Sequence, residues 1–249
     1  MMSKTLLVIP HYNDTERLRP FLVELLKTLP GHFSILVSDD GSLPEERDRL
    51  TQLVAELHAS LNFSAAQLLP PLFTPRNTGK GGAVHRGWRH SAGFDQVAFT
   101  DADGAVNGLE IVRAEAYFRS EECEAEALFA SRVKLLGRSI HRSFKRHLSG
   151  RIFATLVSEL TKVPSYDTQC GLKILSIEAY QKIRPHLCSE GFAFDVELLL
   201  LLLKSGARVV EFPVDWHDVG GSKVSLIRDS LRMAMQVVTI KNRIDALTI

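Results

Sequence analysis

Two acidic residues at positions 101 and 103 have the spacing to bind a metal ion. Asp101 and Asp103 flank one small residue and follow an apolar run that ends at Thr100. Two carboxylates at this spacing can both reach one hard divalent cation when the backbone turns between them. Mg²⁺ and Mn²⁺ typically take one or two such carboxylates together with phosphate oxygens of a substrate. The pair predicts a Mg²⁺ or Mn²⁺ site, with a solvated turn as the alternative.

A second acidic pair follows another apolar run. Asp39 and Asp40 precede Gly41 and Ser42. Two acids at the mouth of a sheet suit the hydroxyl groups of a ribose or the N–H of a base. The alternative interpretation is a type I turn followed by a helix N-cap, for which Asp, Gly and Ser are well suited.

A glycine-rich segment, residues 76–83, lies between these pairs. Its glycines permit close backbone approach, and Lys80 and a following helix N-terminus supply positive potential for a diphosphate. A purely structural turn is the alternative. Neither the Walker A spacing nor a GxGxxG after the first strand is present, which disfavours kinases, ATPases and dinucleotide oxidoreductases.

The stretch from Arg132 to Arg151 is rich in Lys and Arg and contains no Asp or Glu. A phosphate monoester acceptor would suit these cations, because guanidinium groups bind phosphate bidentately. The candidates are Arg132, Arg138, Arg142, Lys145, Arg146 and Arg151. RNA would need similar charges, but few aromatic residues are interleaved, so a nucleic acid partner is not expected.

Strands and helices alternate in the first hundred residues. The predicted strands are Thr5–Ile9, Phe33–Val37, Gln67–Phe73 and Gln96–Thr100, and the predicted helices are Thr15–Thr28, Pro44–Ser60 and Thr78–Ser91. This alternation predicts right-handed crossovers and a parallel sheet. Ligands of such sheets bind beyond the carboxyl ends of the strands, where both acidic pairs lie.

The second half is less regular. Predicted strands are Glu126–Ala130, Leu172–Leu175 and Val209–Phe212, and predicted helices are Ile152–Leu160, Ile177–Ile183, Phe194–Lys204 and an amphipathic segment from Val224 to Ile249. No linker-like or repetitive segment interrupts the 249 residues, which predicts one α/β domain. The terminal helix could lie on a membrane surface or pack on the core or a partner subunit.

Overall composition narrows the class of protein. Thirty Lys and Arg against 29 Asp and Glu leave a net charge of +1, so any basic site must be local. Three cysteines without CxxC spacing suggest neither a disulfide framework nor a zinc site, which favours a reducing cytoplasm. The longest apolar run, Leu198 to Leu203, is far shorter than the ~20 residues of a membrane-spanning helix.

Eight short segments are spread over the region from Leu6 to Ile240. They are residues 8–13 (VIPHYN), 37–42 (VSDDGS), 77–83 (NTGKGGA), 100–103 (TDAD), 131–132 (SR), 167–173 (DTQCGLK), 191–198 (GFAFDVEL) and 221–224 (GSKV). Their order resembles the family 2 glycosyltransferases of GT-A fold, in the polyprenyl-phosphate (dolichyl-phosphate) glucosyl- and mannosyltransferase branch. The resemblance implies a mixed, mainly parallel sheet flanked by helices, in a single domain with a C-terminal amphipathic helix.

The same resemblance implies an inverting, metal-dependent enzyme that moves a hexose from UDP- or GDP-hexose to an acceptor, expected to be a polyprenyl phosphate. Residues 1–105 would bind the nucleotide sugar, residues 106–223 the acceptor, and residues 224–249 would form the terminal helix. A peripheral position at the cytoplasmic membrane face would then fit. Alternatives are a soluble sugar, metabolite or protein acceptor, or a non-catalytic nucleotide-sugar-binding module.

Roles for single residues follow from the resemblance. Asp39 and Asp40 would lie in the nucleotide pocket, and Asp101 and Asp103 would hold Mg²⁺ or Mn²⁺ against the donor diphosphate. Further substrate-binding residues would be Pro10, Tyr12, Asn13, Lys80, Arg132, Arg146, Gln169 and Lys223. Family members often carry Gln or Ser after the second Asp, whereas this chain has Gly104 and Ala105. His217 is therefore expected as a substitute metal ligand, with a surface histidine as the alternative.

Asp195 opens a leucine-rich helix and resembles the acid of the ED-type motifs of this superfamily. It could act as a general base toward an acceptor hydroxyl. A phosphate acceptor is already ionised near neutral pH, so Asp195 and Glu197 would then orient it. Simple N-terminal helix charge is the alternative. Cys170 is expected to be a small packed residue and not a nucleophile.

Overall fold

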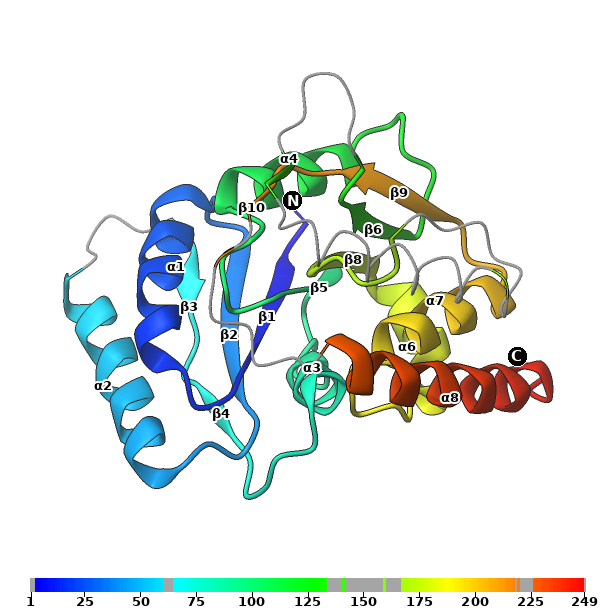
Figure 1. Ribbon diagram of the computed structural model, residues 1–249. Helices are drawn as coiled ribbons and strands as arrows, with labels where there is room; N and C mark the ends of the chain where they lie inside the picture. Colours follow the sequence, from blue (N-terminus) through cyan, green and yellow to red (C-terminus); the bar gives the residue numbers. More distant parts are fainter. Residues whose placement is uncertain are drawn as a thin grey trace.

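A mixed, mainly parallel β-sheet runs through the middle of the molecule (Figure 1). The computed structural model describes residues 3–60, 65–133, 140–141, 159, 167–217, 219 and 226–248. The strands of the sheet are β1 (Thr5–His11), β2 (Phe33–Asp39), β3 (Gln67–Leu68), β4 (Leu72–Phe73), β5 (Gln96–Thr100), β6 (Ala127–Ser131), β8 (Leu172–Ser176) and β9 (Val209–Pro213). Their order is β3-β2-β1-β5-β8-β6-β9, with β4 also paired to β2. Strand β8 is antiparallel to β5 and β6, and the other pairs are parallel.

Helices cover both faces of the sheet. They are α1 (Thr15–Thr28), α2 (Pro44–Ser60), α3 (Lys80–Trp88), α4 (Gly108–Phe118), α6 (Ile177–Ile183), the 3₁₀ turn η1 (Arg184–His186), α7 (Phe194–Lys204) and α8 (Leu226–Asp245). A separate parallel pair joins β7 (Ile140–His141) to β10 (Trp216–His217).

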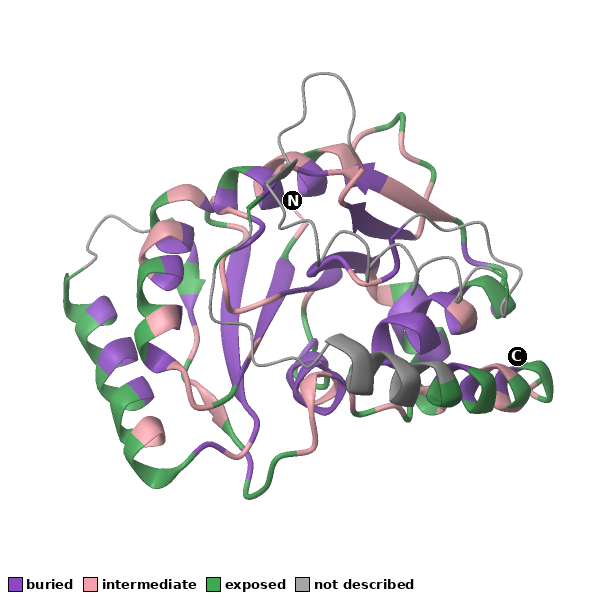
Figure 2. Cartoon of the chain, viewed as in Figure 1, coloured by how far each residue is buried: buried purple, intermediate pink, exposed green. Residues whose placement is uncertain are grey.

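Strand β1 contributes to two hydrophobic cores. Leu7 and Ile9 are fully buried in the core formed with α1, α2 and α4. Leu6 and Val8 are fully buried in the core formed with α3, α6, α7 and α8. Because successive side chains of a strand point to opposite faces, one apolar run supplies both layers. Figure 2 shows β1 and β2 buried along most of their length. The expected α/β architecture is confirmed.

Most predicted elements are present, with shifted ends. Strands β1 and β2 each continue two residues further than predicted, to His11 and Asp39. The predicted strand Gln67–Phe73 is divided into β3 and β4 around Pro70 and Pro71, because proline cannot donate a ladder hydrogen bond. The predicted helix Ile152–Leu160 lies outside the described residues except for Glu159.

Helix α4 was not predicted, because two of the residues on its buried face are acids that break the apolar period. Glu110 accepts a hydrogen bond from the backbone N–H of Asp215 at 2.8 Å and pairs with Arg113. Glu115 accepts from His32 at 3.1 Å. These acids are tolerated because each has partners in the fold.

The described part of α8 packs on α7. Val237, Ile240 and Ile244 are buried there, whereas Met235 and Val238 are exposed. This packing agrees with the core-packed alternative, and a membrane-surface position for the helix stays a prediction. None of the helices within the described residues is both long and apolar enough to cross a bilayer.

Candidate active site

The two acids after β5 lie at the carboxyl edge of the sheet, beside the start of β8. The backbone N–H of Asp101 donates to the carbonyl of Gly171 at 2.9 Å. A side chain at Gly171 would collide with the Asp101 carboxylate, so glycine is required for this approach. Asp103 turns back to accept from the N–H of Ala105 at 3.0 Å. Both carboxylates keep about a third of their surface exposed, 37% for Asp101 and 34% for Asp103.

A chain of alternating charges leads from Asp101 into the protein. The Lys80 ammonium lies 2.8 Å from Oδ1 of Asp101 and 3.3 Å from Oδ2 of Asp195. The Lys173 ammonium lies 2.7 Å from Oδ1 of Asp195, and neither side chain of this second pair is exposed. Lys173 also donates to the carbonyl of Thr168 at 2.8 Å. Lys80 therefore links Asp195 of α7 to Asp101, the residue that follows β5, and Lys173 is a second cation beside Asp195.

The pKa values of these groups follow their partners. Burial alone would lower the pKa of Lys80, but the charges of Asp101 and Asp195 outweigh it and raise the pKa. Loss of water around Asp101 opposes ionisation, yet Lys80 keeps the pKa of that carboxyl below its usual range. Burial and the neighbouring charge of Asp101 raise the pKa of Asp103. Two carboxylates therefore lie close together, with Lys80 beside Asp101 and Arg17 3.5 Å from Asp103.

The repulsion between Asp101 and Asp103 suits a divalent cation held by both carboxylates, because a cation would offset that repulsion. His217 lies nearby through its backbone, whose N–H donates to the carbonyl of Ala105 at 3.1 Å. Across the described part of the chain, no three His, Cys, Asp or Glu side chains are grouped as a metal site. Ligation by His217 stays a prediction.

Asp39 and Asp40 are buried and bound by protein groups. Asp39 accepts from His11 at 3.0 Å and from the N–H of Ser42 at 3.0 Å. Asp40 accepts from the N–H groups of Thr78 at 3.1 Å and Gly79 at 2.6 Å, and it pairs with Arg86. Asp40 thus fastens the glycine-rich segment to the end of β2. Direct contact of either acid with a nucleotide stays a prediction.

The glycines of residues 76–83 serve close packing. Gly79 has a φ of 105°, in the region that favours glycine. A side chain at Gly81 would collide with the carbonyl of Ser189, and the N–H of Gly82 donates to the carbonyl of Glu190 at 2.9 Å. This geometry supports the structural-turn interpretation for the backbone. The Lys80 side chain contacts Asp101, and its binding of a diphosphate stays a prediction.

Arg132 already has a bidentate partner. Its Nε and one Nη lie 2.6 and 2.7 Å from the two carboxylate oxygens of Asp167, and its guanidinium lies 5.5 Å from the Trp216 ring centroid. An acceptor phosphate would have to share this guanidinium. The side-chain nitrogen of Gln169 is buried and has no hydrogen-bond partner among the described residues, and its contact with a substrate stays a prediction. Arg146 and Lys223 lie outside the described residues.

The loop after β1 presents one exposed aromatic side chain. Tyr12 is 46% exposed. Asn13 is tied into the fold instead, because its N–H donates to the hydroxyl of Ser42 at 2.8 Å and its side-chain oxygen accepts from the N–H of Leu43 at 2.8 Å. Pro10 is half-buried within β1. The structure brings this loop to the end of β2, and substrate binding by the three residues stays a prediction.

The acids of α7 are not exposed. Asp195 is held by two lysines, and Glu197 accepts from the N–H groups of Cys188 at 3.0 Å and Ser189 at 2.8 Å. A general base must reach the proton that it removes. A role in orienting the acceptor therefore fits the buried Asp195 better than a role as general base. Both roles stay predictions.

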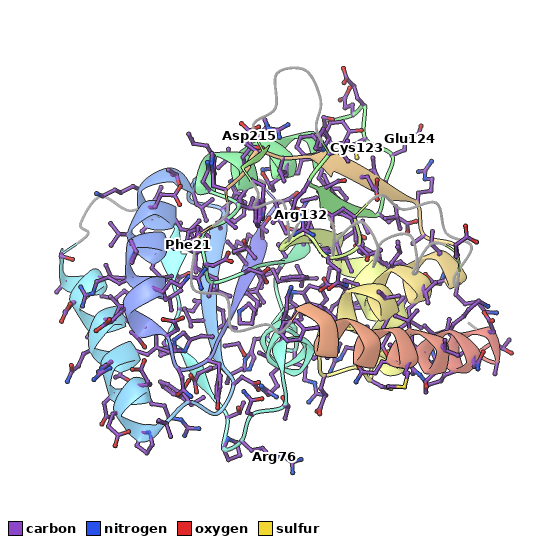
Figure 3. The ribbon with its side chains drawn as sticks, viewed as in Figure 1. Phe21, Arg76, Cys123, Glu124, Arg132 and Asp215 are labelled. Carbon is purple, nitrogen blue, oxygen red and sulfur yellow. The ribbon has the colours of Figure 1, made fainter. Side chains whose placement is uncertain are left out.

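Two cations of the site were not assigned a role from sequence. Lys173 is fully buried in β8, and its only signal is a lysine within an apolar strand. Arg17 of α1 lies 3.5 Å from Asp103. No local pattern marks Arg17, because its partner is 86 positions away along the chain. Figure 3 shows Arg132 near the centre of the molecule, close to the ends of the strands that carry this site.

Solved structures share the fold. Glucosyl-3-phosphoglycerate synthase from Mycobacterium tuberculosis, crystallised with Mn²⁺, uridine diphosphate and glucosyl-3-phosphoglycerate, superposes with a TM-score of 0.63 at 16% identity, covering 100% of this chain and 82% of that one. TarS 1–349 from S. aureus gives 0.57 at 19% identity, covering 96% and 65%. The mixed sheet and its flanking helices define a GT-A fold.

Sequence comparison gives the family. The family model for glycosyl transferase family 2 matches residues 6–165. The chain therefore belongs to glycosyl transferase family 2 and is a glycosyltransferase. It is 32% identical to the dolichyl-phosphate beta-glucosyltransferase of Saccharomyces cerevisiae, covering 94% of this chain and 73% of that protein. The enzyme of the same name from Dictyostelium discoideum is also 32% identical, covering 95% and 73%. The predicted membership is confirmed.

Proposed function

We propose that this protein moves a hexose from a UDP- or GDP-hexose to a polyprenyl phosphate, with inversion at the anomeric carbon. The observation that carries the proposal is the shared lysine: Lys80 contacts both Asp101 at the donor edge and Asp195 on α7. Similarity over almost the full chain to two dolichyl-phosphate beta-glucosyltransferases supports this acceptor class.

Residues 1–105 would bind the donor, and residues 106–223 the acceptor. The donor part contributes β1, β2 and β5, whereas the other part contributes β6, β8 and β9 to the same sheet. One continuous sheet would hold the two substrates in fixed relative positions, which supplies much of the catalysis in a direct displacement. Residues 224–249 would add the terminal helix.

Asp101 and Asp103 would hold a divalent cation, Mg²⁺ or Mn²⁺. When bound, the cation offsets the negative charge that develops on the leaving nucleoside diphosphate. Lys80, already beside Asp101, would add a second positive charge toward the same diphosphate. Arg17, 3.5 Å from Asp103, would help to orient that carboxylate.

The reaction needs little proton transfer if the acceptor is a phosphate. An ionised phosphate oxygen forms the new bond to the anomeric carbon as the bond from that carbon to the diphosphate oxygen breaks. The electron pair leaves with the nucleoside diphosphate, and no covalent enzyme intermediate is formed. Asp195, buried between Lys80 and Lys173, would keep Lys80 in position during this step. The basic stretch from Arg132 to Arg151 would attract the acceptor phosphate.

Acceptance of a lipid phosphate would place the protein at the cytoplasmic face of a membrane as a peripheral enzyme. The amphipathic α8, with Met235 and Val238 exposed, supports such a position.

Transfer from radiolabelled UDP-glucose and GDP-mannose, with Mn²⁺ or Mg²⁺, tests the proposal. A short-chain polyprenyl phosphate is compared with the matching polyprenol and with soluble sugars. We expect product only from the phosphate, and loss of product in Asp103→Asn but not in the control Asp48→Asn on the exposed face of α2. Equal use of polyprenol would overturn the phosphate acceptor. Donor binding without any transfer would indicate a non-catalytic binding module.

A further inference from the structure

Helix α3 presents a second polar face, away from the candidate active site. Lys80, at its first turn, points to Asp101. At 100° per residue, Gly82, His85, Arg86 and Arg89 lie about 140° to 240° around the helix axis from Lys80. This face of α3 therefore cannot take part in the contacts that Lys80 makes.

An open groove of about 970 Å³ lies along that face. Helix α3 forms one wall, α6 and η1 form the other with Tyr180 and Arg184, and the segment before α3 closes one end with Arg76. We call it the α3–α6 groove. Its size is that of a site for a small ligand. In Figure 3, Arg76 extends outward from the loop that precedes α3.

The α3–α6 groove is lined by four arginines, Arg76, Arg86, Arg89 and Arg184, whereas Glu190 is the one acid among its lining residues. Arg86 is already paired with Asp40. The guanidinium groups of the other three make no hydrogen bond or ion pair with any residue in the described ranges. The groove thus holds three guanidinium groups that form no ion pair within the described residues.

Arg89 and Arg184 come from two different walls of the α3–α6 groove. Burial raises the pKa of the Tyr180 hydroxyl, and the charges of Arg184 and Arg89 both act against that rise. A ligand held between the two walls of the groove could contact both arginines. His85 adds little charge, because burial, and then Arg89 and Arg86, lower its pKa to about 4.

We propose that the α3–α6 groove binds a phosphoryl group, of a small phosphorylated solute or of a lipid headgroup, on the face of α3 that points away from Lys80 and Asp101. Guanidinium groups match phosphate oxygens with paired N–H donors, and a phosphate dianion would neutralise Arg89 and Arg184 together. Neither guanidinium group has an ion-pair partner in the part of the chain that the structure describes, so binding would break no ion pair there.

Isothermal titration with inorganic pyrophosphate, in EDTA and at low salt, tests this proposal. The variant Arg89→Gln/Arg184→Gln should bind at least about 10-fold more weakly, because two charge-assisted contacts are lost. The matched control Arg19→Gln removes an exposed arginine on α1 that pairs with Glu56, and it should bind like the wild type. Both variants should unfold close to the wild-type temperature, since Arg89 and Arg184 form no ion pair within the described residues and the Arg19–Glu56 pair is exposed.

Sedimentation with phosphatidylcholine vesicles, with and without phosphatidic acid, distinguishes the two sources. Pyrophosphate binding that depends on Arg89 and Arg184, without vesicle binding, assigns a soluble phosphate. Sedimentation with phosphatidic acid that the double variant loses assigns a lipid headgroup. The proposal is wrong if the wild type and the double variant bind both probes equally, which is the result expected when pyrophosphate binds only beside Lys80. It is also wrong if neither probe binds.

Discussion

Replacing Lys173 by methionine tests whether the buried charge chain holds the active site together. Methionine keeps much of the length and volume of lysine but removes the ammonium that lies 2.7 Å from Oδ1 of Asp195. Asp195 would keep a single cation, Lys80 at 3.3 Å, in a position with no exposed surface. The carbonyls of Thr168 and Cys170 would each lose a donor.

The expected loss of stability is large. Removing one partner of a buried ion pair typically lowers the free energy of unfolding by about 3–5 kcal/mol, because the remaining charge stays buried. For a domain of this size, 1 kcal/mol changes the melting temperature by roughly 2–4 °C, so Lys173→Met should lower it by about 6–20 °C. Lys241→Met, at an exposed pair with Asp245, is the matched control and should cost about 0.5 kcal/mol or less.

Urea denaturation, followed by circular dichroism, measures the effect in a double-mutant cycle with Asp195→Asn. We expect the double variant to lose at least about 1 kcal/mol less than the sum of the single losses, because it no longer buries an unpaired carboxylate. A single variant within 1 kcal/mol of the wild type, or strictly additive losses, would show that the two side chains do not stabilise each other.

The remaining predictions concern three other positions. Asp40→Ala removes the hydrogen-bond acceptor of the Thr78 and Gly79 N–H groups, so we expect weaker donor binding in titration calorimetry and faster proteolysis of the glycine-rich segment. Unchanged donor affinity would limit Asp40 to a structural role. Arg132→Gln should weaken binding of an acceptor phosphate roughly 10- to 150-fold, because a charge-assisted contact is lost. Initial-rate kinetics should show a higher acceptor KM and an unchanged donor KM, and an unchanged acceptor KM would exclude the contact. Burial raises the pKa of Cys170 to about 11, so its thiol stays protonated at pH 8 and should resist iodoacetamide in the native protein, whereas exposed Cys188 should react. Mass spectrometry of the labelled peptides measures the difference, and rapid labelling of Cys170 would contradict its burial.

The order of the elements could be read from the sequence because it depends on local pattern. Thr15–Thr28 and Pro44–Ser60 were predicted with the observed ends, since their apolar positions repeat at helical spacing. Helix α4 was missed because Glu110 and Glu115 occupy its buried face, and only their partners in the folded chain explain why they are there.

The sequence by itself determined the class of protein and the edge of the sheet that carries the site. Acids that directly follow apolar strands must lie at the carboxyl ends of those strands, whatever the rest of the chain does. The order of the eight motifs was enough to identify the family, because each motif is a short, contiguous segment.

Only the tertiary structure decided which charges meet. Lys80 and Asp195 are 115 positions apart, and the Asp40 carboxylate is bound by groups 38 to 46 positions further along the chain. Local pattern assigned Asp39 and Asp40 to a nucleotide and Arg132 to a phosphate, whereas the fold supplies protein partners for all three. Likewise, Arg89 and Arg184 line one groove because α3 and α6 pack on the same face of the sheet. A carboxylate or a guanidinium can pair with any opposite charge of suitable geometry, so its partner is fixed by the packing of distant elements and not by its neighbours in sequence.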